Sequence, residues 1–282
     1  MVGTRKIAAG MLAVLAVLLA GCLLLPGKFG SDLSLRRDGS FSFGYKGEII
    51  LMALADPKDM AGPDASATFT PEPCFDDETI EKRPCTKDEV DKQKAAFDET
   101  QKGAADKKKQ DADMMKAMLG GIDPSDPKAG DEFAARLMRQ QGWKSVIHRG
   151  NGRFDVEYNI AGRLDHDFVF PVIEKMSGVA PFLTVVRRTD GTVRVEAPAF
   201  STGGAASPMM AMMQSMGGLK PDSKDSDKLP KAEGTFAVVT DGEILANNTD
   251  EGPRPDAGGK RLSWVVNSQT AAAPTALVRL GN

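Results

Sequence analysis

This sequence contains few of the residues that most often carry catalysis or bind metals. Its 282 residues include two histidines, three cysteines, two tryptophans and two tyrosines. The G-x-S-x-G, P-loop, H-E-x-x-H and C-x-x-C motifs are all absent. A catalytic site is recognised as a nucleophile beside a base, or as paired carboxylates in a suitable setting. We therefore expect a protein that is not an enzyme, with no catalytic residues, no metal and no other cofactor.

Charge and hydropathy argue against a nucleic-acid-binding protein and against a membrane-spanning helix. The formal net charge is −3, and the chain has no basic stripe of the kind that binds nucleic acid, so we expect no nucleic-acid partner. The apolar run near the N-terminus, residues 7–20, has about fourteen residues. A helix of that length is too short to cross a hydrocarbon core of about 30 Å.

The same apolar run has the organisation of an export signal. Arg5 and Lys6 precede it, and the order Leu19-Ala20-Gly21-Cys22 follows it and resembles a bacterial lipobox. The resemblance implies lipid transfer to the Cys22 thiol, cleavage before Cys22 and acylation of the new amine. One acyl chain binds a bilayer only marginally, whereas two or more hold a protein there. An ordinary signal peptide or an N-terminal membrane anchor is the alternative.

We predict a signal peptide over residues 1–21 and a lipidated tether over 22–30, with Leu23, Leu24 and Leu25 at the lipid boundary. In Gram-negative lipoproteins an aspartate directly after the cysteine tends to retain the protein at the inner membrane. Leu23 occupies that position here. This implies a cell-envelope protein on the periplasmic face of the outer membrane, attached to the membrane by its N-terminal lipid.

Two cysteines remain for the exported domain. Cys74 and Cys85 are separated by ten residues, and in an exported chain such a pair indicates a disulfide that closes a small loop. The chain-entropy estimate for a loop of this size is about 2–3 kcal/mol. Free thiols and a metal site are the alternatives, although no histidine lies nearby to complete a metal site.

Alternating apolar and polar residues around tight turns predict β-hairpins. The turns are Asp38-Gly39, Gly150-Asn151-Gly152, Asp190-Gly191 and Asp241-Gly242. Hairpins pair antiparallel. Residues 131–141 predict an amphipathic helix. We therefore expect an α+β fold, in which an antiparallel sheet built from hairpins carries two or three helices on one face.

Residues 31–282 are expected to form a single domain with two inserts. In the first, at about 56–125, Thr86-Lys87-Asp88-Glu89 predicts a capping box that opens a highly charged, solvated helix. The second, at about 201–233, contains the run GGAASPMMAMMQSMGG. A connection of this length is usually functional or disordered.

Methionine is the abundant residue of the second insert. Because its thioether side chain is soft and unbranched, it adapts to irregular apolar partners. Three interpretations remain open: a surface loop that places a few side chains in the core, a mobile segment that contacts acyl chains, and a Cu(I) site, although the segment has no histidine. The candidate lipid contacts are Met209, Met210, Met212, Met213 and Met216.

The pattern GTFAVVTDGEILANN…GKRLSWVVNS…TALVRL, together with DLSLRRDGSFSF near the N-terminus, resembles bacterial lipoproteins of the LppM type. The matching positions are Gly242, Ile244, Asn247 and Trp264. The inserts lie outside the likeness. The resemblance implies an α+β domain that binds lipid or glycolipid in the cell envelope, and it transfers no catalytic residues.

The leading hypothesis is a membrane-tethered lipoprotein that binds a lipid or another envelope component. A scaffold that recruits a protein partner through the charged helix at 86–110 is the alternative. A hydrolase of envelope substrates comes third, with His166, between Asp165 and Asp167, as its base. Aromatic side chains that would line an apolar lipid cavity, or else simply fill the core, are Phe41, Phe43, Tyr45, Phe154 and Phe168.

Overall fold

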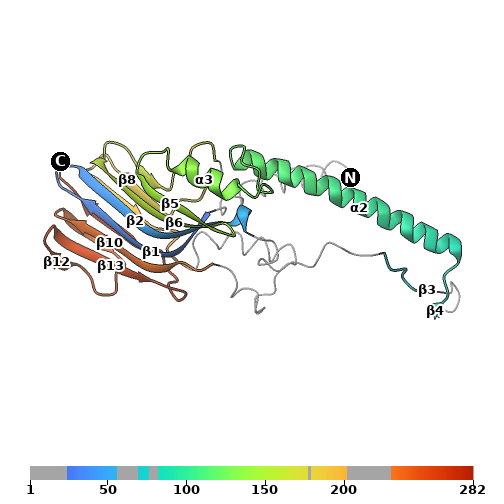
Figure 1. Cartoon of the computed structure of the whole chain (residues 1–282). Helices are drawn as coiled ribbons and strands as arrows, with labels where there is room; N and C mark the ends of the chain where they lie inside the picture. The colour runs from blue at the N-terminus through green and yellow to red at the C-terminus, as the bar shows by residue number, and fades with distance from the viewer. Residues whose placement is uncertain (1–23, 56–68, 76–81, 177–178, 202–229, 282) are drawn as a thin grey trace.

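The computed structural model describes residues 24–55, 69–75, 82–176, 179–201 and 230–281. Two sheets share one hydrophobic core, and a long helix extends away from one end of this sandwich (Figure 1). The predicted α+β class with mostly antiparallel strands is confirmed. Among the described residues, no helix combines the length and the apolar character that a bilayer crossing requires.

The larger sheet has seven strands. In order across the sheet they are β12 (Arg254–Asp256), β13 (Gly259–Val266), β10 (Glu233–Thr240), β1 (Leu24–Leu35), β2 (Ser40–Leu51), β6 (Arg153–Arg163) and β5 (Trp143–Gly150). β1 with β2, and β5 with β6, form the hairpins that the first two turns predict. β1 and β10 pair in parallel, the one such pairing among the strands described here.

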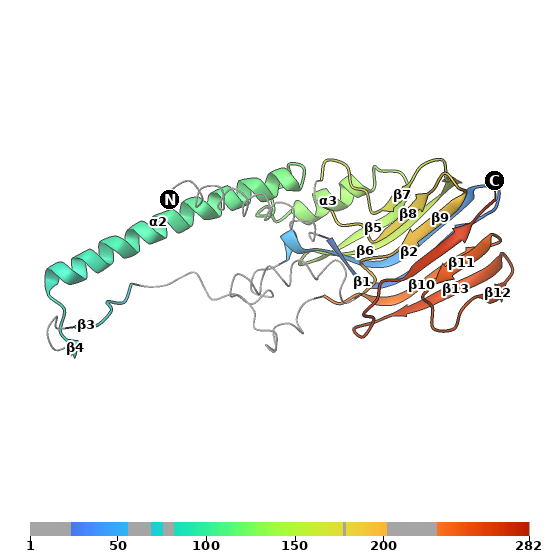
Figure 2. The ribbon, with the colours of Figure 1, turned by 180° about the vertical axis from the view of Figure 1, so that it is seen from behind.

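The smaller sheet has five strands and lies on the other side of the core (Figure 2). Its order is β11 (Glu243–Asn247), β14 (Thr275–Arg279), β9 (Thr192–Glu196), β8 (Leu183–Arg187) and β7 (Phe168–Phe170). β8 and β9 form the hairpin predicted at Asp190-Gly191. The segment around Phe168 forms the edge strand β7.

The hairpin predicted at Asp241-Gly242 is wrong. β10 belongs to the seven-stranded sheet and β11 to the five-stranded sheet, so the turn carries the chain from one sheet to the other. A Cβ at Gly242 would lie 2.7 Å from the Arg279 carbonyl oxygen, which explains why glycine occupies this crossing. An Asp-Gly turn reverses the chain both in a hairpin within one sheet and in a crossing between two sheets. Its sequence does not specify which sheet receives the second strand.

In the described part of the chain, three helices accompany the strands: η2 (Met52–Leu54), α2 (Lys87–Met118) and α3 (Ala129–Leu137). The predicted capping box opens α2: the Glu89 carboxylate accepts from the Thr86 N–H at 2.8 Å, and the Thr86 hydroxyl accepts from the Glu89 N–H at 3.4 Å. α3 packs against β5 and buries Phe133 and Leu137, at the helical spacing that the sequence indicates. α2 covers neither sheet along most of its length and projects from the sandwich (Figures 1 and 2).

The N-terminal boundary of the folded domain differs from the expected one. β1 begins at Leu24, so most of the predicted tether over 22–30 is part of a strand. Leu24 and Leu25 are buried in the core rather than available to lipid, because Leu24 pairs with Leu51 and Leu25 with Ile50 at the end of β2. The domain therefore starts two residues after Cys22.

Aromatic rings fill much of the space between the two sheets. The Phe170 ring lies within 6 Å of five others, with its centroid 4.8 Å from that of Tyr158 and 5.0 Å from that of Phe43. The fully buried Tyr45 donates its hydroxyl to the Glu48 carbonyl at 2.9 Å, and burial raises the pKa of that hydroxyl. A buried hydroxyl needs such a partner, which fixes the ring in place.

Candidate functional site

The outer face of the seven-stranded sheet, away from the core, carries a groove of about 830 Å³. It lies over β1, β2 and β6, and residues of β5, β10, β12 and β13 complete its lining. Sites for small molecules usually occupy about 300–1,000 Å³. We call this feature the outer-face groove, and its charged and amide side chains are Asp32, Arg36, Lys144, Asn159, Asp256 and Arg261.

Short side chains form the floor of the outer-face groove. One row across β1, β2 and β6 consists of Asp32, Gly44 and Asn159, and the next row consists of Ser34, Ser42 and Ala161. Successive residues of a strand point to opposite faces, so the intervening Leu33 and Phe43 are buried in the core. The floor is low because none of the three strands places a large side chain on it.

A carboxylate–guanidinium network lies at the β12–β13 side of the groove. Arg261 reaches Asp256 at 2.9 Å and Asp32 at 3.1 Å. The hydrogen bond from Arg261, followed by one from the Gly258 N–H, lowers the pKa of Asp256. Hydrogen bonds to Asp256 and Asp32 raise the pKa of Arg261 in turn. One guanidinium thus links the two carboxylates and holds all three side chains in place.

Two further cations line the groove. The Arg36 guanidinium donates a hydrogen bond to the Gly258 carbonyl between β12 and β13. Lys144 lies at the opposite side, on β5. Within the described part of the chain, neither Arg36 nor Lys144 forms an ion pair. Three cations therefore share the groove with two carboxylates, both of which are already bound to Arg261.

A second cluster of interacting side chains lies at the N-terminal end of α2, away from the sandwich. Cys74 and Cys85 form the predicted disulfide beside the short strands β3 (Cys74–Phe75) and β4 (Lys82–Arg83). Arg83 places two nitrogens 2.9 and 2.6 Å from the Glu89 carboxylate. These hydrogen bonds, and those from the Thr86 N–H and hydroxyl, lower the pKa of Glu89 from 4.5 to about 2. We call this feature the α2 clasp.

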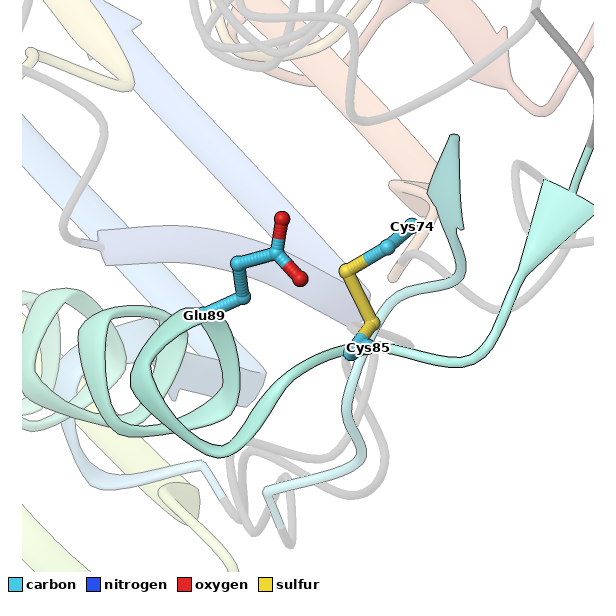
Figure 3. A group of neighbouring side chains, drawn as sticks. All are labelled: Cys74, Cys85 and Glu89. Atoms are coloured by element: carbon cyan, nitrogen blue, oxygen red, sulfur yellow. A yellow bond between two sulfur atoms is a disulfide. The ribbon is translucent and has the colours of Figure 1, made fainter. Parts of the chain in front are cut away.

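The α2 clasp also contains the one group of potential metal ligands found among the described residues, Cys74, Cys85 and Glu89 (Figure 3). Cysteine binds metals as a thiolate. Here the two sulfur atoms are bonded to one another, and the Glu89 carboxylate is bound to Arg83 and Thr86. In this oxidised form the group is a covalent clasp rather than a set of free ligands.

The other residues singled out in the sequence do not meet in one site. Cys22 and the five candidate methionines, Met209, Met210, Met212, Met213 and Met216, lie outside the described residues. The aromatic side chains expected to line an apolar cavity belong to the packed core, where the Phe43 and Phe168 rings, for example, are in contact. Of the two alternatives, these side chains follow the second: they fill the core, because neighbouring rings occupy the space between them.

The two histidines have separate surroundings. The Nδ1 of His148 lies 3.0 Å from the Asp131 carboxylate, and the His148 ring stacks on Phe154, which ties α3 to the sheet. His166 is exposed, and the carboxylate of its neighbour Asp167 accepts from the Arg187 N–H at 3.0 Å. The two rings therefore do not form a shared site.

The outer-face groove was not predicted from the sequence. Its signal was present in the alternation on either side of the Asp38-Gly39 turn, where Asp32, Ser34, Ser42 and Gly44 occupy the positions between buried residues. Only the register of β1, β2 and β6 brings these positions side by side. Lys144 and Arg261 come from strands far apart in the sequence, so no local pattern connects them.

Comparisons with known proteins find a likeness at the level of solved structures. No family model matches the chain, and no curated protein matches it. The chain is similar to the folded domain of LppM from Mycobacterium tuberculosis, solved by NMR, with a TM-score of 0.32 and 12% identity, over 92% of this chain and 94% of that chain. This is the lipoprotein type that the sequence pattern resembles. At that score and identity the likeness assigns no function, and the groove is interpreted from its own geometry.

Proposed function

We propose that this chain is a non-enzymatic lipoprotein of a bacterial cell envelope and that it binds an envelope component in the outer-face groove. The lipid attachment point is Cys22, within the order Leu19-Ala20-Gly21-Cys22. The single observation that carries the binding function is the groove itself, whose floor of short side chains lies across three central strands. Leu23 after the cysteine favours the periplasmic face of the outer membrane.

The beginning of β1 supports a short attachment. Leu23 alone separates Cys22 from the buried Leu24. Two extended residues span at most about 7 Å. A lipid on Cys22 would therefore hold the sandwich against the bilayer, where envelope components are concentrated.

The polar lining of the groove indicates which part of an envelope component it binds. Its lining includes six charged or amide side chains, whereas a site for acyl chains is mostly apolar. The polar part of an envelope component therefore fits the outer-face groove better than an acyl chain does.

The anchor is tested with the full chain expressed in a bacterium and labelled with a palmitate analogue. The parent is expected to take up label and to fractionate with membranes, whereas Cys22→Ser is expected to do neither. Cys74→Ser is the control, because it also removes a thiol but leaves the lipobox unchanged. An unlabelled parent would overturn the anchor.

Binding is tested separately with the purified full chain and a polar envelope extract, and bound molecules are detected by native mass spectrometry. Ser42→Leu places a larger side chain on the groove floor and is expected to abolish binding. Ser40→Leu, at the start of the same strand but outside the groove lining, is expected to retain it. Equal binding by both variants would place the site elsewhere.

A scaffold function is the second candidate, and α2 with its clasp favours it. The 32 residues of α2 project from the sandwich, and beyond its N-terminus the clasp presents Phe75 with 46% of its surface exposed. If α2 recruits a protein, Phe75→Ser removes the captured partner in a crosslinking experiment, and Val172→Ser, another exposed apolar residue on the sandwich, does not. Loss of the partner in both variants, or in neither, would contradict the scaffold role of the clasp.

A further inference from the structure

The outer-face groove carries more positive than negative charge. Asp32 and Asp256 both contact Arg261, so the two carboxylates share a cation that already belongs to the groove. Arg36 and Lys144 form no ion pair within the described part of the chain, although Arg36 lies near enough to Asp256 and Asp38 to help lower the pKa of both carboxyls. A site with two such cations attracts an anion, and a guanidinium is suited to phosphate or carboxylate oxygens.

The Arg36 side chain is held at its position before any ligand arrives. Its guanidinium donates to the Gly258 carbonyl, and Gly258 in turn donates its N–H to Asp256 at 3.0 Å. A cation fixed by a neighbouring turn loses less conformational freedom on binding than a mobile side chain does. The β12–β13 turn therefore presents a pre-positioned charge to the groove.

Neutral hydrogen-bonding groups occupy the floor between the two cations. Ser34 and Ser42 each provide a hydroxyl that donates and accepts, and Asn159 provides an amide. β1 and β5, which carry or adjoin the cations, are three strand spacings apart, about 14 Å. A single phosphate ion is far smaller than this span and the groove volume of about 830 Å³. The space in the groove that a phosphate leaves unfilled suits a ligand with several hydroxyl groups.

We propose that the outer-face groove binds an anionic sugar, whose phosphate or carboxylate pairs with Arg36 or Lys144 and whose hydroxyl groups bond to Ser34, Ser42 and Asn159. This inference rests on the proposed function, since it takes the same groove as the binding site. It adds the chemical class of the ligand, which is polyhydroxylated and carries at least one negative charge.

The test uses the purified full chain and three probes, glucose 6-phosphate, glucose and inorganic phosphate, at millimolar concentrations in saturation-transfer NMR and calorimetry. Glucose 6-phosphate is expected to bind at least tenfold more tightly than either of the other two. Added NaCl is expected to weaken that binding, because salt screens the charges involved. Ser42→Leu is expected to abolish it.

Charge-removing variants test the contributions of Arg36 and Lys144 one at a time. Arg36→Gln and Lys144→Gln are each expected to weaken glucose 6-phosphate binding at least fivefold. Lys46→Gln is the matched control, because Lys46 lies on the same face but outside the groove lining and pairs with Glu157 at 3.4 Å. If Arg36→Gln disturbs folding through its lost bond to Gly258, Lys144→Gln still decides, since Lys144 forms no ion pair with any residue that the structure describes.

Three outcomes would overturn the proposal of an anionic sugar. None of them by itself overturns the proposed binding function. Equal binding of glucose and glucose 6-phosphate shows a neutral sugar site. Equal binding of phosphate and glucose 6-phosphate shows an anion site without sugar recognition. Failure of all three probes, while an envelope extract still yields a bound molecule that Ser42→Leu removes, retains a binding groove but excludes the ligand class.

Discussion

Gly130 and Gly103 are both helical glycines, but their surroundings differ. A Cβ at Gly130, in α3, would lie 2.2–2.6 Å from three atoms of the His148 ring. That ring is held by Asp131 on one side and by Phe154 on the other. A Cβ at Gly103, in α2, would meet nothing within 4 Å. The same residue type therefore has a packing role in α3 and none in α2.

We predict opposite effects of alanine at these two positions. Gly130→Ala should lower the free energy of unfolding by about 1–2 kcal/mol, because the His148 ring must move out of a packed position. Gly103→Ala should stabilise α2 by up to about 1 kcal/mol, since alanine favours the helix over glycine. Thermal unfolding measures the first change, and hydrogen exchange of α2 amides measures the second. A higher unfolding temperature for Gly130→Ala would show that His148 is not fixed between its two neighbours.

At the scale of elements, α2 is stabilised at its N-terminal end rather than along its length. The helix is highly polar, and most of its described side chains are exposed. Packing therefore contributes little to most of it, and the capping box, the Arg83–Glu89 pair and the disulfide act at its start. Glu89 takes part in two of these three interactions.

The pH dependence of the first turn of α2 follows from Glu89. Because its pKa falls from 4.5 to about 2 on folding, its stabilisation is fully present above pH 4.5. The stabilisation is lost as the pH falls from about 4.5 to about 2. Amide exchange at the start of α2 should therefore accelerate in that window.

Glu89→Gln should remove this pH-dependent stabilisation and leave the turn less protected at neutral pH. Asp88→Asn is the control, since it changes an acid in the same turn but leaves the capping box intact. An unchanged pH profile in Glu89→Gln would mean that another group controls the turn.

At the scale of the whole molecule, large aromatic rings pack the two sheets against one another. Phe170, on the edge strand β7, contacts Phe43 and Tyr45 of the opposite sheet. It also contacts Trp143 and Tyr158, on β5 and β6. One short strand thus joins the smaller sheet to three strands of the larger one.

Phe170→Ala should lower the free energy of unfolding by about 3–5 kcal/mol, because it leaves a cavity between the sheets. Val172→Ala, two residues later and 65% exposed, should change it by less than about 0.5 kcal/mol. Denaturant unfolding followed by far-UV circular dichroism measures both. If the two variants were equally stable, the sheets would not depend on the Phe170 contacts.

Local chemistry by itself determined much of this protein. Alternation and turn residues located three of the four predicted hairpins, Thr86 and Glu89 located the start of α2, and the spacing of Cys74 and Cys85 indicated the disulfide. These features depend on residues close together in the chain. Dihedral preferences, capping hydrogen bonds and short-loop closure act over that same range, so a sequence pattern expresses them directly.

Only the tertiary structure decided how these pieces combine. It sent the chain across to the second sheet at Gly242, buried Leu24 in β1 and placed Lys144 and Arg261 around one groove. Each of these outcomes depends on strand pairing between distant segments. β1 with β10, for example, joins residues about two hundred positions apart. Long-range pairing is selected by packing of the whole core, and no local pattern contains that information.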